Sequence, residues 1–184
     1  MVVATRVKLN YADLQLFPND GKRHELIDGE HIMSPAPETK HQDTVGNLFA
    51  LFRGFVRQNK LGRVFVAPVD VVFSEYDVIE PDIVFVSANR KQIITKTNIR
   101  GAPDLVVEIL SPSTKEIDRK TKFKLYEKYG VREYWIIDPD AETIEIYALR
   151  AEGYVLFQKF SRGDSVRSDV LSGFACMVDE LFEV

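Results

Sequence analysis

The stretch LVVEILSPSTKEIDRKTKFKLYEKYGVREYWII, residues 105–137, predicts the centre of the fold. Its two ends, residues 105–110 and 134–137, are apolar runs with the length of buried strands. Between them, residues 113–129 have the spacing of an amphipathic helix, which ends at Gly130. A strand, a helix and a further strand within about 30 residues are typical of a crossover unit, whose parallel strands are covered on both faces.

The rest of the chain adds strands and helices around this unit. Asp28-Gly29 is a strong signal for a tight hairpin turn, and Pro68 places the strand-like stretch around it at a sheet edge or a bulge. The pattern predicts a mixed α/β fold, with a mixed central sheet flanked by helices. We expect helices at residues 11–17, 41–60 and 178–182, a hairpin at 24–34, and strands at 63–73, 83–86, 143–148 and 154–160.

Length and composition are those of one folded domain. The 184 residues are 45% hydrophobic and 28% charged, and domains cluster at about 100–150 residues, so we expect a single domain over residues 1–184. The one cysteine, Cys176, excludes an intramolecular disulfide, and no apolar run approaches the ~18 residues of a membrane span. The N-terminus lacks the pattern of a signal peptide, so we expect a cytoplasmic protein with no membrane partner.

Glu108 is the first candidate for a functional residue, because it lies inside the apolar run at residues 105–110. A charge in the middle of a buried strand costs several kcal/mol unless it is paired or bound to a metal. Two interpretations follow: a structural carboxylate paired with an arginine, or an acid retained for chemistry. By the two-residue period of a strand, Glu108 shares its face with Val106 and Leu110.

Two aspartates, Asp82 and Asp104, each follow a proline and precede an apolar run. Aspartate is common in turns after proline, and the sequence does not separate a turn role from a chemical role for either one. Asp104 lies four residues before Glu108 on the same strand face, which corresponds to about 13 Å at ~3.3 Å per residue. That distance is too long for Asp104 and Glu108 to bind one ion.

Lys122 is a third candidate because of its position on the predicted helix. At about 100° per residue, the apolar stripe of residues 113–129 includes both Asp118 and Lys122, whereas three neighbouring lysines lie on the solvent face. One interpretation is an i,i+4 pair with Asp118, in which the lysine stem packs on the core and its head reaches water. The other is that Lys122 points at the preceding strand, which carries Glu108.

Two acids on adjacent strands together with a lysine form a known arrangement in hydrolytic enzymes. Carboxylate oxygens are ligands that Mg²⁺ prefers, and the bound metal polarises a phosphoryl group and helps to generate hydroxide. The lysine orients the water or stabilises the charge that builds up on the phosphate. Zinc is less favoured, because His24, His31 and His41 are the only histidines and lack the spacing of a zinc hydrolase.

Five segments then carry a resemblance: HELIDGE at 24–30, SP at 34–35, PDIVFV at 81–86, GAPDLVVEILSPST at 101–114 and DRKTKFKLYEKYGVREYWIIDP at 118–139. Over nearly the whole chain, the sequence resembles the Uma-type family of restriction-endonuclease-like proteins in the PD-(D/E)XK phosphodiesterase superfamily. The resemblance implies a restriction-endonuclease-like domain that hydrolyses DNA with Mg²⁺ or Mn²⁺. It also implies that Pro81-Asp82 is the PD, that Glu108 is the (D/E), and that Asp82 and Glu108 are the metal ligands.

The lysine of the superfamily pattern is absent from its usual position. That pattern puts it two residues after the acid, where this sequence has Leu110. In families of this kind the lysine can come from the following helix, and Lys122 is the residue that the helical pattern indicates. Glu25 resembles the additional acid that some members place near the metal, with an exposed strand residue as the alternative. We expect Asp118 to orient Lys122. His41 opens the long predicted helix, and we expect it to be a cap or surface residue, with a place in the site as the alternative.

The net charge of −4 means that DNA binding requires a local basic surface. Nine basic residues form a candidate phosphate track, although such runs are usually solvated faces: Arg90, Lys91, Lys96, Arg100, Lys115, Arg119, Lys120, Lys124 and Lys128.

Several alternatives remain open at this point. The acidic pI and Leu110 favour a catalytically inactive module that binds nucleic acid or a protein on a nuclease fold. RNA or a nucleotide is an alternative substrate for the same metal site. We also expect a homodimer, because a small nuclease domain that cuts both strands commonly pairs two sites.

Overall fold

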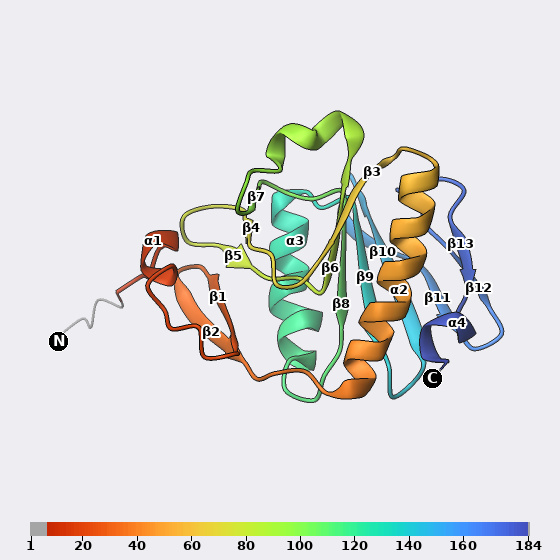
Figure 1. The fold of residues 1–184 in the computed structure, drawn as a ribbon, viewed down its shortest axis with the longest axis horizontal. Helices are drawn as coiled ribbons and strands as arrows, with labels where there is room; N and C mark the ends of the chain where they lie inside the picture. The colour runs from red at the N-terminus through yellow and green to blue at the C-terminus, as the bar shows by residue number, and fades with distance from the viewer. Residues whose placement is uncertain (1–6, 184) are drawn as a thin grey trace.

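The computed structural model describes residues 7–183, which form two β-sheets, a separate strand pair and several helices (Figure 1). The larger sheet contains β3 (Gly62–Val66), β6 (Ile83–Ser87), β8 (Leu105–Ile109), β9 (Glu133–Asp138), β10 (Thr143–Arg150) and β11 (Gly153–Ser161). The smaller sheet contains β1 (Arg23–Ile27), β2 (Glu30–Ser34), β4 (Val71–Val72), β5 (Val78–Ile79) and β7 (Ile99–Arg100). The separate pair is β12 (Ser165–Arg167) and β13 (Ala175–Met177). The helices are α1 (Tyr11–Leu14), α2 (Thr39–Gln58), the 3-10 helix η1 (Ala88–Ile93), the π-helix η2 (Ile117–Lys122), α3 (Phe123–Tyr129) and α4 (Asp179–Phe182).

The six-stranded sheet has the order β11-β10-β9-β8-β6-β3, and the predicted crossover unit forms its centre. Strands β8 and β9 are parallel, with Val107 opposite Trp135, and η2 and α3 connect them. Gly130 ends α3 in the left-handed conformation (φ 80°), which glycine adopts without a steric penalty. The other neighbouring pairs of this sheet are antiparallel, so the prediction of a mixed sheet is confirmed.

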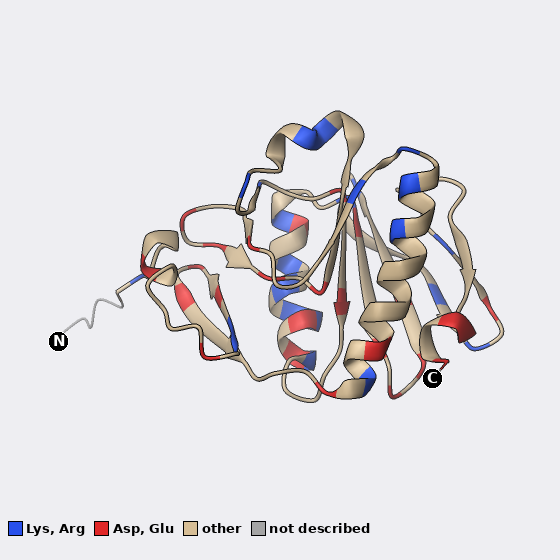
Figure 2. Ribbon diagram, viewed as in Figure 1, with Lys and Arg blue, Asp and Glu red and all other residues tan. Residues whose placement is uncertain are grey.

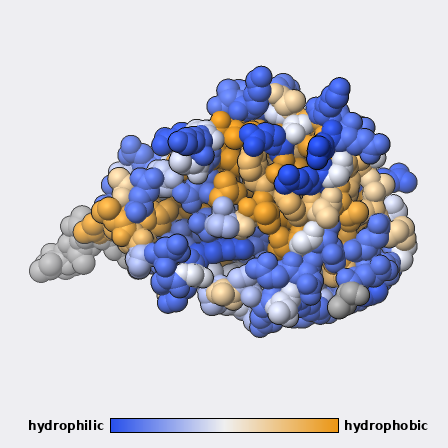
Figure 3. Space-filling model, viewed as in Figure 1, coloured by the Kyte–Doolittle hydropathy of each residue, from blue (hydrophilic) through white to orange (hydrophobic). Residues whose placement is uncertain are grey.

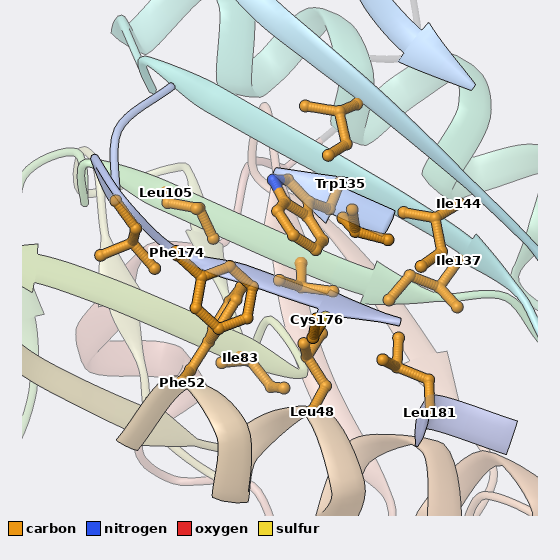
Figure 4. Close-up of a cluster of buried hydrophobic side chains, with 14 of the residues drawn as sticks. Leu48, Phe52, Ile83, Leu105, Trp135, Ile137, Ile144, Phe174, Cys176 and Leu181 are labelled. Atoms are coloured by element: carbon orange, nitrogen blue, oxygen red, sulfur yellow. The ribbon is translucent and has the colours of Figure 1, made fainter. Parts of the chain in front are cut away.

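Helix α2 covers one face of the six-stranded sheet, and α3 covers the other (Figure 1). Leu48 and Phe52 recur on the inner side of α2 and are fully buried. Phe52 packs edge-on against Trp135 of β9, with ring centroids 5.2 Å apart (Figure 4). Strands covered on both faces need apolar residues at every position, which explains the nearly continuous apolar runs of β6, β8 and β9.

The predicted hairpin is β1 and β2, in which Leu26 pairs with His31. Its two turn residues, Asp28 and Gly29, both have positive φ (52° and 74°). A two-residue hairpin commonly uses a type I′ turn, which matches the twist of the strands and requires positive φ at both turn residues. Asp-Gly is favoured there for that reason. The local sequence therefore determines this element.

The second sheet was not expected, because three of its five strands are only two residues long. Residues 63–73 divide near Pro68, so that β3 belongs to the larger sheet and β4 to the smaller one. The sheet order β2-β1-β5-β4-β7 links the hairpin to segments far away in the chain. This sheet holds the hairpin against the end of β6, where the candidate site lies (Figure 1).

Candidate active site

The register of β6 and β8 brings Asp82 next to Glu108. The strands are antiparallel with Ile83 opposite Val107, so the residue before Ile83 lies beside the residue after Val107. The Ile109 N–H donates a hydrogen bond to Asp82 Oδ2 at 2.8 Å. Both acidic side chains are buried, with Asp82 1% and Glu108 2% exposed.

Strand β8 divides its side chains between the two faces of the sheet. Val107 packs in the core under α2, whereas Val106 and Leu110 pack on the other side, against Tyr126. Glu108 shares that second face, as its spacing predicts, and Tyr126 donates a hydrogen bond to Glu108 Oε1. Leu110 is thus a core residue, and the acid points at the crossover helix.

Lys122 lies at the centre of a group of buried acids. Its Nζ is 3.1 Å from Glu108 Oε1, 3.0 Å from Glu25 Oε1 and 3.5 Å from Asp118 Oδ1. Burial alone would lower the pKa of Lys122, but the neighbouring carboxylates outweigh it and raise the pKa well above its usual value. Lys122 therefore stays a positively charged ammonium group.

An irregular helix carries Asp118 and Lys122. Both belong to η2, a π-helical segment that precedes the regular turns of α3. Such segments are rare and occur frequently at functional sites. The predicted placement of both residues on the inner face of the helix is confirmed, because Asp118 is 1% and Lys122 4% exposed.

Two groups from other elements hold Asp82 in its ionised form. Arg23 Nη1 lies 2.7 Å from Asp82 Oδ1, and His41 Nε2 lies 3.2 Å from Asp82 Oδ2. Burial raises the pKa of Asp82, but the His41 hydrogen bond and the Arg23 charge outweigh it and hold the pKa at about 2. Asp82 is consequently a carboxylate at neutral pH.

Glu108 has the opposite shift. Burial raises its pKa to about 8; the charge of Lys122 opposes this increase, and Asp118 adds to it. The adjacent acids of one site thus differ in proton affinity, a pattern typical of active sites. A divalent cation bound beside Glu108 would favour the carboxylate form, because the ion would be the largest local charge.

A pocket of about 210 Å³ opens onto these side chains. It is formed where the hairpin, the N-terminal end of α2, the ends of β6 and β8, and η2 converge (Figure 1). The ionisable residues that line it include Arg23, Glu25, His41, Asp82, Glu108 and Lys122. The site is therefore reached from solvent although each acid is nearly covered.

The acids of the pocket suit a hard cation that is only partly enclosed by protein. Within residues 7–183, no group of three or more His, Cys, Asp or Glu side chains is arranged to hold a metal ion. Mg²⁺ commonly binds one or two carboxylates and completes its coordination with water and substrate phosphate. Asp82 and Glu108 offer such a pair, and the hydrogen bonds to Glu108 in the described chain both engage Oε1.

Two buried polar atoms also indicate a site that is completed by another molecule. Among the described residues, His41 Nδ1 and Asp118 Oδ1 have no hydrogen-bond partner, although Lys122 Nζ lies 3.5 Å from the latter. Buried polar groups are nearly always satisfied by protein or by water. Their presence in the pocket supports a polar occupant beside the acids.

The alternative interpretation of Glu25 and the expectation for His41 are wrong. Glu25 is not an exposed strand residue: it is 2% exposed, and its Oε1 accepts a hydrogen bond from the Glu80 N–H at 2.9 Å. His41 is neither a cap nor a surface residue, because α2 begins at Thr39 and the His41 ring is 6% exposed against Asp82. Both residues face the pocket because long-range packing, not local pattern, determines their environment.

Sequence reasoning missed Arg23 and Tyr126. Arg23 contacts Asp82 across 59 positions of the chain, so no local signal could reveal it. Tyr126 lies four residues after Lys122 on the same helical stripe, and both donate to Glu108 Oε1. The helical spacing could therefore have indicated Tyr126.

Three comparisons with known proteins bear on the family. The structure resembles a crystal structure of "a putative nuclease belonging to DUF820" from Anabaena variabilis, with a TM-score of 0.78 and 23% sequence identity. The similarity covers 95% of this chain and 97% of that protein. No curated protein matches the chain, and no helix in the described residues is long and apolar enough to cross a membrane. A family model covers residues 10–179, and the chain therefore belongs to the Uma2 family, described as "Putative restriction endonuclease".

Proposed function

We propose that this chain is a Mg²⁺-dependent endonuclease that hydrolyses phosphodiester bonds in DNA. The proposal includes a single restriction-endonuclease-like domain over residues 1–184. The observation that carries it is the 3.1 Å contact between Lys122 Nζ and Glu108 Oε1. Leu110 stands where the family resemblance expects a lysine, and this contact supports the view that the crossover helix supplies that lysine to the same acid.

Asp82 and Glu108 are the proposed ligands of Mg²⁺, with Mn²⁺ as a substitute. The metal, when bound, would polarise the phosphoryl group and favour hydroxide at neutral pH. Each carboxylate oxygen has two lone pairs, so Asp82 can keep its contacts to Arg23 and His41 and still bind a cation. Those contacts keep Asp82 ionised and fix its orientation.

The Lys122 ammonium group is proposed to act on the water or on the phosphate. A positive charge held in a buried site stabilises the negative charge that develops on a phosphoryl group in the transition state. Glu25 and Asp118 are positioning residues in this account, because they hold Lys122 from the sides. Glu25 also accepts from the Glu80 backbone, which ties it to β5 and its sheet.

The proposal is tested by cleavage of supercoiled plasmid with Mg²⁺ and with EDTA. We expect nicking or linearisation by the wild type only with Mg²⁺, and a loss of about 10³-fold for Glu108→Gln, because metal binding contributes several kcal/mol. Glu116→Gln is the matched control, since Glu116 is an exposed acid on the same connection. That control is expected to keep the wild-type rate.

The substrate class is decided in the same assay with single-stranded DNA and RNA in parallel. Cleavage of RNA alone would replace DNA in the proposal. Binding of DNA without Mg²⁺-dependent cleavage of any substrate would contradict the enzyme and favour the inactive binding module, which the apolar Leu110 already suggests. We further propose that the chain forms a homodimer to cleave both strands. Light scattering that shows a monomer bound to DNA would contradict the homodimer.

A further inference from the structure

A groove with a basic lining lies at the opposite end of α2 from the candidate active site. Figure 2 shows basic residues at this end of α2 and in η1. It has a volume of about 550 Å³ and is formed by the last turns of α2, the loop after it, β3 and η1. Five exposed basic residues line it: Arg53, Arg57, Lys60, Arg63 and Lys91. No acidic residue of the described chain is part of its lining. We call this surface the α2 groove.

Among the described residues, the basic side chains of the α2 groove have no partner of opposite charge. None of the five forms an ion pair with a described residue. Arg53 instead lies over the ring of Phe49 at 5.6 Å, and Arg63 over Phe65 at 5.0 Å. Contact with an aromatic face holds a guanidinium group without neutralising its charge. Figure 3 shows hydrophilic side chains gathered at this end of the molecule, over η1 and the end of α2.

The phosphate track predicted from the sequence has a different character. Five of its nine basic residues form ion pairs: Arg90 with Asp104, Lys115 with Asp138, Arg119 with Glu145, Lys120 with Glu116, and Lys128 with Asp77. Carboxylates therefore already compensate most of that surface. Of the four track residues without an ion pair in the described chain, only Lys91 lines the α2 groove, where it joins four basic residues that the predicted track does not include.

The shape of the charge distribution favours a linear polyanion. Arg53 and Arg57 are four residues apart on one side of α2, which corresponds to a rise of about 6 Å. Lys60 and Arg63 continue the series beyond the end of the helix, towards the first residues of β3. A row of positive charges suits the row of phosphates in a nucleic acid backbone, where each strand has one charge per ~3.4 Å of axis.

We propose that the α2 groove binds the phosphate backbone of duplex DNA at a distance from the cleavage site. The inference rests on the proposed function, because it says where the substrate is held outside the catalytic pocket. His41 and Arg57 are sixteen residues apart in α2, which is about 24 Å at ~1.5 Å per residue. A duplex in contact with both sites therefore extends over at least about 7 base pairs at ~3.4 Å each.

The test is the binding of a fluorescent duplex of two helical turns, measured by anisotropy in EDTA, so that cleavage does not interfere. The groove variant is Arg57→Gln/Lys60→Gln/Arg63→Gln. The matched control is Arg150→Gln/Lys159→Gln/Arg167→Gln, which removes three exposed basic residues outside both the groove and the predicted phosphate track. Thermal unfolding of each variant checks that it is folded.

We expect the groove variant to bind at least about 10-fold more weakly at ~100 mM salt. Its plot of log affinity against log salt is expected to be less steep by about 2.7, since each lost phosphate contact contributes ~0.9. The control variant is expected to stay within about twofold of the wild type, because its three residues make no phosphate contact in this account.

Equal binding by the groove variant and the wild type would overturn the inference, as would equal losses in both triple variants. Binding of the wild type to phosphatidylserine vesicles but not to DNA would overturn it in favour of a membrane surface. The nuclease is judged separately: groove-dependent binding without Mg²⁺-dependent cleavage refutes only the enzyme. If the wild type cleaves DNA and the groove variant binds DNA as tightly as the wild type, only the proposal for the groove is refuted.

Discussion

Asp82 and Asp104 have similar local sequences but lie in different environments in the structure. Each follows a proline and precedes an apolar strand. Because β6 and β8 are antiparallel, the residues before them lie at opposite ends of the strand pair. Asp82 meets Glu108 at one end, whereas Asp104 at the other end accepts from the Ser87 N–H at 2.8 Å and pairs with Arg90 at 3.1 Å. Strand direction, not local sequence, separates the two aspartates.

The charge balance at the two ends differs as well. At the Asp104 end, one buried carboxylate has two arginines within 3.5 Å. Burial raises the pKa of Asp104, but the Ser87 and Arg90 hydrogen bonds outweigh it and lower the pKa. At the Asp82 end, four buried acids face two cations: Glu25, Asp82, Glu108 and Asp118 against Arg23 and Lys122. Burial and the neighbouring acids raise the pKa of Glu108, and a divalent cation bound beside it would favour and compensate its carboxylate form.

The largest expected difference between the two ends is in catalysis. We expect Asp82→Asn to lower Mg²⁺-dependent DNA cleavage by about 10³-fold, since a lost metal ligand removes several kcal/mol of transition-state stabilisation. Asp104→Asn is expected to change the rate by less than about twofold where both variants are folded, because it is remote from the reacting groups. Initial rates on plasmid DNA measure this. Similar losses in both variants would break the comparison.

The next difference is in stability, and it has the opposite direction. Asp104→Ala removes the acceptor of a buried N–H and the partner of Arg90, so we expect a loss of about 2–3 kcal/mol. Urea unfolding at neutral pH measures it. Asp140→Ala is the control, because Asp140 forms an ion pair with Lys40 in which its side chain is 79% exposed. A control loss as large as that of Asp104→Ala would contradict a structural role specific to Asp104.

The third predicted difference is a gain in stability at the Asp82 end that depends on pH. The pKa of Glu108 rises from 4.5 to about 8 on folding, so the cost of the acid to the folded state grows as the pH increases between these values. Glu108→Gln has no charge and avoids that cost. We therefore expect its melting temperature, relative to the wild type, to increase by roughly 5–10 °C from pH 5 to pH 8 in EDTA. Thermal unfolding across this range checks the sign, and a relative decrease would contradict it.

Much of the fold could be predicted because its central elements have strong local patterns. The crossover unit, the Asp-Gly hairpin and α2 each have a clear period or turn signal. The two-residue strands β4, β5 and β7 have no period of their own. Their pairing depends on contacts between distant segments, so the second sheet could not be predicted.

The candidate site could be predicted where a charge interrupts an apolar pattern. Glu108 and Lys122 stand out for that reason, and the structure places them in contact. Arg23 and His41 lie in segments with mixed patterns, and they reach Asp82 only because the hairpin and the start of α2 pack at the end of β6. No spacing within either segment contains that information.

The central claim is that Asp82 and Glu108 together bind a divalent cation. The most direct test is calorimetric titration of Mn²⁺ into the wild type, Asp82→Ala and Asp104→Asn, each with and without a short DNA duplex. We predict that the wild type and Asp104→Asn bind Mn²⁺ and that Asp82→Ala does not. Absence of binding by the wild type even with DNA, or unchanged binding by Asp82→Ala, would contradict the claim.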